Sequence, residues 1–246
     1  MKSPLLLSLL YAALEIFRPA GLEFTHRNSP TKQKYLIETM GGGVGLLDYN
    51  NDGLLDVFLV NGGKIDDPQK LPPNFARREP DYWNRLYAQN RDGSFKDVTA
   101  QAGLSKVGNE YGMGVAVGDY DNNGFPDIYV TNYGQNVLYR NNGDGTFLDV
   151  TAKAGVAAGG WSVSSGFLDY DNDGHLDLFV SRYLDYDLSR NILCGSPFLS
   201  YCRPDKYEVF VYRVGTPGKT GFLKVCSTKV EVALVGSGQN SCFGLE

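Results

Sequence analysis

The stretch that decides the fold is Asp119-Tyr120-Asp121-Asn122-Asn123-Gly124-Phe125-Pro126-Asp127. The chain of 246 residues contains this pattern three times, beginning at residues 48, 119 and 169. All three copies follow the consensus D-Y-[DN]-N-[DN]-G-x-x-D. Self-similar segments at intervals of roughly 50 residues are typical of proteins built from repeated structural units. We therefore treat each copy as the marker of one unit.

Each copy is flanked by short apolar runs. A run with glycines precedes each copy, and a β-branched and aromatic run follows it. These runs lie at 43–47, 114–117 and 166–168 before the copies, and at 57–60, 128–131 and 178–181 after them. Runs this short are typical of strands rather than helices. The marker is therefore a loop between two strands.

Two more strands complete the unit. Residues 84–87 and 136–139 match as a third strand, Asp-Gly turns follow at 92–93 and 144–145, and 97–99 and 149–151 match as a fourth. Asp-Gly between apolar runs is a hairpin signal. Four strands per unit are typical of a propeller blade. We predict an all-β fold, an incomplete β-propeller of about three to four four-stranded blades.

The acidic loops have the composition of calcium sites. Oxygen-bearing side chains occupy positions 1, 3, 5 and 9, and glycine at position 6 permits a tight bend. Calcium prefers six to eight oxygen ligands in flexible geometry, and these side chains with the carbonyl of position 7 supply most of them. Without a cation, the clustered carboxylates would repel one another. The sequence therefore predicts bound Ca²⁺.

Two other interpretations of the loops were weighed. An EF-hand begins similarly but needs a glutamate at position 12 and flanking helices. Position 12 is here Leu59, Val130 or Val180, inside expected strands. Alternatively the aspartates only form Asx turns. Three copies at matching offsets favour calcium over that alternative.

The acidic loops and the turn after the third strand of the unit resemble those of a known family. The loops, together with Asn-Asn-Gly-Asp-Gly-Thr-Phe at 141–147, resemble the FG-GAP or VCBS repeats whose calcium loops also occur in integrin α-subunits. The run Met40-Gly41-Gly42-Gly43-Val44 and residues 194–205 are most similar to the ASPIC/UnbV type, the cartilage acidic protein-like family. By this resemblance the metal ligands are Asp48, Asn50, Asp52, the Leu54 carbonyl and Asp56; Asp119, Asp121, Asn123, the Phe125 carbonyl and Asp127; and Asp169, Asp171, Asp173, the His175 carbonyl and Asp177.

The rest of the chain divides around these blades. Residues 1–20 have the charge and apolar run of a signal peptide, although a short buried strand or helix is the alternative. Residues 21–207 hold the blades, with a proline-bearing, charged surface insertion at 62–83. Residues 208–246 depart from the repeat. We expect a secreted, periplasmic or cell-surface protein, with no stable insertion in a membrane.

Four cysteines are present, of which Cys194 and Cys202 bracket Gly195-Ser196-Pro197. An exported protein is expected to join these two in a local disulfide, and two free thiols are the alternative. The glycine triplet at 41–43 precedes a strand, so it indicates a flexible or tightly packed start of a blade rather than a dinucleotide fingerprint.

Composition and motifs disfavour several function classes. The net charge of −5 argues against nucleic acid as a partner. The segment 215–220 resembles a phosphate-binding loop but has Arg213 where that motif needs glycine. No G-x-S-x-G occurs. Trp161, Tyr133 and Tyr183 suit either packing between blades or an aromatic ligand surface.

The sequence therefore predicts a calcium-binding extracellular interaction or scaffold module, for example in cell adhesion, with no catalytic activity of its own. Its partner would be an extracellular protein or glycan, with the insertion at 62–83 as the expected contact. The alternative is a lectin-like carbohydrate-binding domain or a carbohydrate-active enzyme, because propellers also carry these functions.

Overall fold

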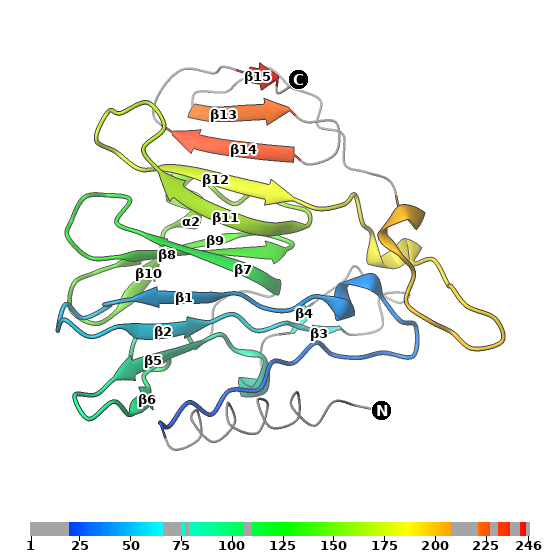
Figure 1. Ribbon diagram of the computed structural model, residues 1–246, viewed down its shortest axis with the longest axis horizontal. Coiled ribbons are helices and arrows are strands. Elements are labelled where there is room, and N and C mark those ends of the chain that lie inside the picture. Colours follow the sequence, from blue (N-terminus) through cyan, green and yellow to red (C-terminus); the bar gives the residue numbers. More distant parts are fainter. Residues whose placement is uncertain are drawn as a thin grey trace, which may run out of the picture.

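The computed structural model describes residues 20–65, 79–105 and 110–207 in full, and the backbone of short strands at 75–76, 221–226, 231–236 and 242–244. Within these residues the fold is built from β-sheets whose strand pairs are antiparallel except for β13 with β15, which confirms the all-β prediction. Figure 1 shows three main sheets lying side by side. The strands are β1 Val44–Leu47, β2 Asp56–Leu59, β3 Lys64–Ile65, β4 Phe75–Ala76, β5 Arg85–Gln89, β6 Phe95–Asp97, β7 Tyr111–Gly118, β8 Asp127–Tyr133, β9 Val137–Asn141, β10 Phe147–Asp149, β11 Ser162–Leu168, β12 Asp177–Arg182, β13 Gly221–Cys226, β14 Glu231–Gly236 and β15 Cys242–Gly244.

The first two sheets repeat one meander. Their strand orders are β1-β2-β5-β6 and β7-β8-β9-β10, and every neighbouring pair is antiparallel. Each acidic loop joins the first strand of a sheet to the second. The residue pair next to each loop is equivalent in all three sheets: Leu47 lies opposite Asp56, Gly118 opposite Asp127 and Leu168 opposite Asp177. The repeated strand-loop-strand unit of the sequence is thus one structural unit.

The third sheet has a different strand order, β11-β12-β14-β13-β15. The strand next to β12 is β14, and β13 lies outside it although it comes earlier in the chain. The pairing of β13 with β15 is parallel. The first two strands of the third sheet therefore pair as in the other two sheets, but its remaining strands do not follow one another in chain order.

Helical segments are short and lie between the strands. A single turn of α-helix, α2 Thr151–Ala154, follows β10 and ends at Gly155 in the left-handed conformation, with φ of 71°. Glycine tolerates this φ because it has no Cβ. The 3₁₀ segments are η1 Leu36–Thr39, η2 Pro80–Tyr82, η3 Leu188–Arg190 and η4 Pro204–Lys206.

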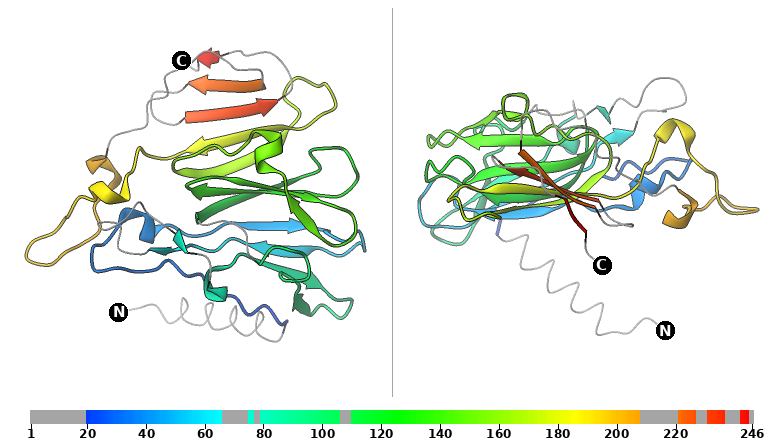
Figure 2. Two further views of the ribbon diagram at one scale, coloured as in Figure 1. Left: turned by 180° about the vertical axis from the view of Figure 1, so that it is seen from behind. Right: turned by 90° about the horizontal axis from the view of Figure 1, so that it is seen from above.

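Glycines let the first strands of neighbouring sheets approach backbone to backbone. A Cβ added to Gly43 would lie 2.9 Å from the Cα of Gly114, and one added to Gly114 would lie 2.5 Å from the carbonyl oxygen of Val163. Real Cβ atoms almost never approach other heavy atoms this closely. Strand β7 therefore lies between β1 and β11, each of which it contacts. Figure 2 shows the sheets from two further directions.

The hydrophobic core lies between the sheets. One cluster, which includes Phe58 and Leu86 of the first sheet and Ile128 of the second, fills the first gap. A second cluster with Tyr129, Leu138 and Leu178 fills the next one. Burying this apolar surface between sheets is the main stabilising contribution of such a stack.

A third cluster is aromatic. Trp161 and Tyr133 are both buried, with ring centroids 6.0 Å apart in an edge-to-face arrangement, and the ring of Tyr183 lies 5.3 Å from Trp161. Edge-to-face pairs at this spacing stabilise a core. The burial supports the packing interpretation of these aromatic residues over an exposed ligand surface.

The segments around the three main sheets are partly described. Residues 20–28 run along the first sheet, where the hydroxyl of Tyr87 donates to the carbonyl of Glu23 at 2.7 Å. In the predicted insertion, β3 pairs with β4, while 66–74 and 77–78 lie outside the described residues, as do 1–19 of the predicted signal segment. Within the described ranges no helix has the length and apolar character needed to cross a membrane.

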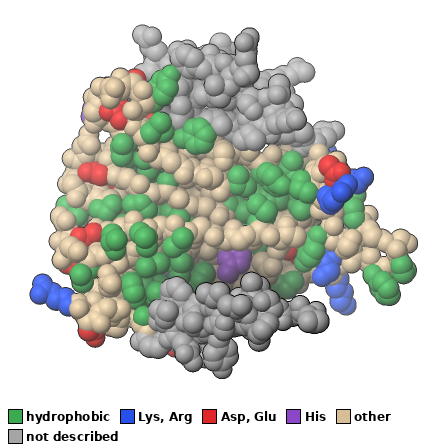
Figure 3. Space-filling model, viewed as in Figure 1, with side chains coloured by type: hydrophobic (Ala, Val, Ile, Leu, Met, Phe, Trp, Pro, Cys, Tyr) green, Lys and Arg blue, Asp and Glu red, His purple; other side chains and the backbone are tan. Residues whose placement is uncertain are grey.

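Cys194 and Cys202 are joined by a disulfide that closes a loop projecting from the sheets. The loop extends to the right in Figure 1, on the side opposite the acidic loops. Hydrophobic side chains stand at the end of this loop in Figure 3. Phe198, within the loop, is the most exposed of the large hydrophobic residues that the structure describes.

Candidate metal centres

The three acidic loops lie along one edge of the molecule, at the left in Figure 1. Their backbones are closely alike. The asparagine at position 4 is left-handed in each loop, with φ of 60° at Asn51, 56° at Asn122 and 59° at Asn172. The glycine at position 6 follows with φ between 83° and 86°. Asparagine and glycine are the residues that tolerate this region, which explains why the consensus fixes them.

The aspartate at position 1 holds the loop closed in every copy. One carboxylate oxygen accepts the N–H of position 5 at 2.9 to 3.1 Å, and the other accepts the N–H of the glycine at 2.8 to 3.0 Å. The side-chain oxygen of position 5 in turn accepts the N–H of position 7 at 2.8 to 2.9 Å. These bonds turn the oxygens of both side chains toward the inside of the loop.

The aspartate at position 9 connects the loop to the sheet. Its Oδ2 accepts the N–H of the tyrosine at position 2, at 3.0 Å for Asp56, 3.0 Å for Asp127 and 2.9 Å for Asp177. In the first two sheets its Oδ1 accepts an N–H from the end of the third strand, Gln89 at 2.8 Å or Asn141 at 2.7 Å. Asp56 and Asp127 are fully buried.

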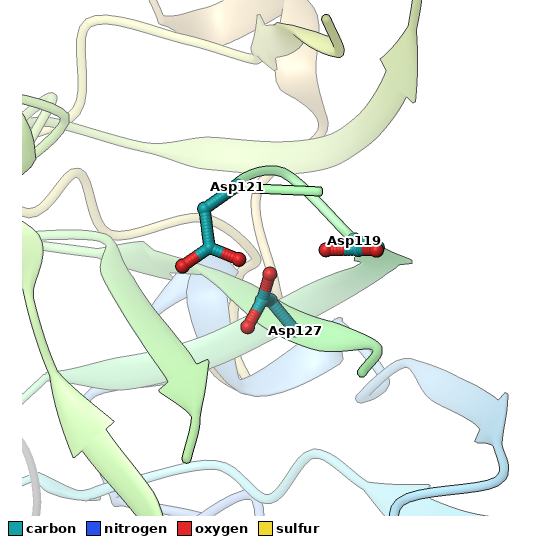
Figure 4. A group of neighbouring side chains, drawn as sticks. All are labelled: Asp119, Asp121 and Asp127. Atoms are coloured by element: carbon teal, nitrogen blue, oxygen red, sulfur yellow. The ribbon is translucent and has the colours of Figure 1, made fainter. Parts of the chain in front are cut away.

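Carboxylates converge in two of the loops. One oxygen each of Asp119, Asp121 and Asp127 lies within 4.8 Å of the others, as Figure 4 shows, and Asp169, Asp171 and Asp177 form an equivalent group. Three carboxylates at this spacing suit a hard cation such as Ca²⁺. The first loop has Asn50 at position 3, and its amide donates to Asp52 at 2.9 Å.

The structure therefore brings the predicted carboxylate ligands of positions 1, 3 and 9 together in the second and third loops, and the remaining side-chain ligands, with those of the first loop, stay a prediction. Leu54, Phe125 and His175 lie at position 7 as expected, but the ligand role of their carbonyl oxygens stays a prediction. Sequence reasoning missed Gln89 and Asn141, which hold the position 9 carboxylates. The available signal was the Asn-Asn-Gly-Asp-Gly element, which begins at Asn141.

Asn141 also links two loops. It is fully buried, and its amide donates to the carbonyl of Tyr49 in the first loop at 2.8 Å while its backbone N–H donates to Asp127 in the second. The second and third loops are joined by Asn122, whose amide donates to the carbonyl of Gly174 at 3.0 Å. The three loops are thus connected along the edge rather than separate.

Burial raises the pKa of the position 9 carboxyls. The pKa of Asp127 rises from its ordinary value of 3.8 to about 6, because burial disfavours the charged form and the nearby Asp121 and Asp119 add to this, against the backbone donors Asn141 and Tyr120. The pKa values of Asp56 and Asp177 are raised, with burial again the largest cause. A bound divalent cation would remove this penalty by favouring the ionised form.

These pKa shifts predict pH-dependent calcium binding. A carboxyl with a pKa near 6 is mostly ionised at pH 7 and about nine-tenths protonated at pH 5, so calcium affinity is expected to fall about tenfold over that range. Calcium binding at pH 6 should release protons, which titration calorimetry in buffers of different ionisation enthalpy detects. An apparent enthalpy that is the same in all buffers at pH 6 would contradict the prediction.

The comparisons with known proteins agree with this geometry. The model of the FG-GAP-like repeat matches residues 48–130 and 119–180, and together these segments cover more than half of the chain. The chain belongs to the FG-GAP-like repeat family. The two matches coincide with the strand-loop-strand units of the first, second and third sheets, so the family assignment and the acidic loops depend on the same residues.

Relatives of this FG-GAP-like chain include cartilage acidic protein 1 from Homo sapiens, which is 45% identical over 64 residues. That alignment covers 26% of this chain and 9% of the relative. Cartilage acidic protein 1 is 44% identical over 64 residues in Mus musculus and 43% identical over 61 residues in Xenopus tropicalis. The aligned segment thus spans about a tenth of the length of these relatives.

Proposed function

We propose that this FG-GAP-like chain is a calcium-loaded module of β-propeller type that mediates interactions outside the cytoplasm and has no catalytic activity of its own. The observation that carries the proposal is the convergence of Asp119, Asp121 and Asp127, with an equivalent group in the third loop. Buried carboxylates with raised pKa values need a counter-charge at neutral pH, and calcium supplies it.

Two further observations support an extracellular setting. A disulfide joins Cys194 and Cys202, and disulfides persist in oxidising compartments. Relatives at 43 to 45% identity over part of the chain are named for cartilage, a tissue that is mostly extracellular matrix. The proposed partner is accordingly an extracellular protein or glycan.

The residues that would hold the ions are the loop side chains described above. Calcium would neutralise the carboxylates and hold position 1, position 3 and position 9 together, which fixes the link between the first two strands of each sheet. Because Asn141 and Asn122 connect neighbouring loops, an ion in one loop also restrains the next. Calcium would therefore stabilise the stack as a whole.

Counting bound ions in single-site variants tests this proposal. We expect about three calcium ions per chain by native mass spectrometry, and about two in Asp121→Ala or Asp171→Ala. Asp144→Ala is the matched control, because Asp144 is an exposed turn aspartate outside the loops, and it should leave the count unchanged. A wild-type chain that binds no calcium at millimolar concentration would refute the proposal.

The partner is tested separately. We expect the chain to bind a component of a panel of immobilised glycans and extracellular matrix proteins in calcium, and to release it in EDTA. Turnover of any glycan in the panel, seen as new reducing ends or unsaturated products, would contradict the absence of catalytic activity.

A further inference from the structure

The sheets inside the chain meet through one recurring pair of faces. At the first junction, Val115 and Val117 of β7 lie over Gly45 of β1. A Cβ added to Gly45 would lie 3.0 Å from a methyl group of Val117 and 3.5 Å from Val115. Beside this contact, Leu47 and Tyr49 are buried, with exposed fractions of 3% and 9%.

The second junction joins the same faces of the next two sheets, with its closest contact two residues further along the strand, at Gly118, which corresponds to Leu47. Phe167 of β11, which corresponds to Val117, lies against Gly118 of β7. A Cβ added to Gly118 would lie 2.8 Å from the Phe167 ring. Ala116, which corresponds to Gly45, is buried in the same cluster, and Tyr120 packs against that cluster. The chain thus forms the same type of interface twice.

The first sheet exposes one half of this interface. Val44 and Leu46 of β1 stand at the positions of Val115 and Val117, one repeat earlier. Their exposed fractions are 61% and 58%, whereas Val115 and Val117 pack against the core cluster between the first two sheets. We call Val44 and Leu46 the leading face.

The third sheet exposes the other half. Gly166 of β11 corresponds to Gly45, but a Cβ added there would meet no atom within 4 Å. Leu168 and Tyr170 correspond to the buried Leu47 and Tyr49, yet they are 39% and 44% exposed. We call Gly166, Leu168 and Tyr170 the trailing face. Hydrophobic side chains lie over β1 and β11 on the side that Figure 3 shows.

We infer that the leading face of one copy of this chain binds the trailing face of a second copy, head to tail. The two exposed faces are the two halves of the interface that the chain already forms between its own sheets, so a second copy supplies each with the partner that its repeat equivalent has. Because the faces differ from each other, the contact is heterologous, and it either closes into a ring or continues to longer assemblies. The inference depends on the packing of the repeats and not on calcium binding.

Sedimentation velocity of the full chain tests this inference. In calcium, at concentrations up to roughly 100 μM, the wild-type chain should sediment as species larger than one chain of 27.0 kDa. Leu46→Arg removes the leading face and Leu168→Arg removes the trailing face, so each variant alone should be monomeric. Mixed in equal amounts, the two variants retain one intact pair of faces and should form a dimer and nothing larger.

Leu148→Arg is the matched control, because Leu148 is similarly exposed on β10 but belongs to neither face, and it should associate as the wild type does. Circular dichroism melts establish that each variant is folded, and Val44→Arg with Tyr170→Arg forms a second pair. A wild-type chain that stays at 27.0 kDa overturns the inference. So does a mixture of the two variants that remains monomeric, or a control that loses association equally.

Discussion

Transfer of the chain from millimolar calcium into EDTA is expected to lower its Tm by about 15 to 30 °C. An ion present at a hundred times its dissociation constant stabilises the folded state by about 2.7 kcal/mol per site, so three sites contribute about 8 kcal/mol. In a domain of this size each kcal/mol corresponds to about 2 to 4 °C. Thermal unfolding followed by circular dichroism measures the shift.

Two controls test whether the acidic loops cause this shift in Tm. Magnesium at the same concentration should restore much less of the Tm, because it demands a smaller, octahedral site and keeps its water ligands. The double variant Asp121→Ala/Asp171→Ala should keep only part of the calcium response. A Tm that is equal in EDTA and in calcium would show that the loops are turns closed by their own hydrogen bonds, such as those that the N–H groups of Asp52 and Gly53 donate to the Asp48 carboxylate.

The substitution Gly42→Ala is expected to destabilise the fold by about 2 to 3 kcal/mol, as overpacking of a close contact does. A Cβ at this position would stand well inside contact distance of the carbonyl oxygen of Val60 and 3.2 Å from the ring of His26. The carbonyl belongs to the backbone at the end of β2, so it cannot rotate away as a side chain would. Urea unfolding in saturating calcium measures the change.

Gly41→Ala is the matched control for this prediction. Gly41 is the preceding residue, it is exposed, and a Cβ added there meets no atom within 4 Å. Its substitution should change the free energy of unfolding by less than about 0.5 kcal/mol. Equal effects of the two substitutions would mean that the triplet acts through chain flexibility rather than through close packing.

The sequence predicted the parts of this fold that are local and repeated. The loops could be predicted because their hydrogen bonds join residues two to seven positions apart, and because Asn122 and Gly124 are required by backbone conformation alone. The Cys194–Cys202 bridge is likewise local in the chain. At these places the residues that form the motif also form the contacts, so the sequence pattern alone was enough to predict the local structure.

The contacts that sequence reasoning missed are long-range or unrepeated. The bond from Asn141 to the Tyr49 carbonyl spans two sheets, and only the packing of one sheet on the other brings these groups together. The pairing of β12 with β14 involves residues 231–236, which carry no trace of the repeat. The short β3–β4 pair lies in a segment that the sequence indicated only as an insertion.

The strand order of the third sheet has a consequence for the course of folding. In the second sheet each strand pairs with the next along the chain, and in the first sheet the longest connection runs from Leu59 to Arg85, so these closures span shorter segments and cost less chain entropy than the closure of the third sheet. In the third sheet, Arg182 must find Glu231 across roughly 50 residues, a slower search. Until it succeeds, β12 presents an open edge on which strands of other chains can add. The nascent protein is therefore most vulnerable to aggregation at β12, after its first two sheets have formed.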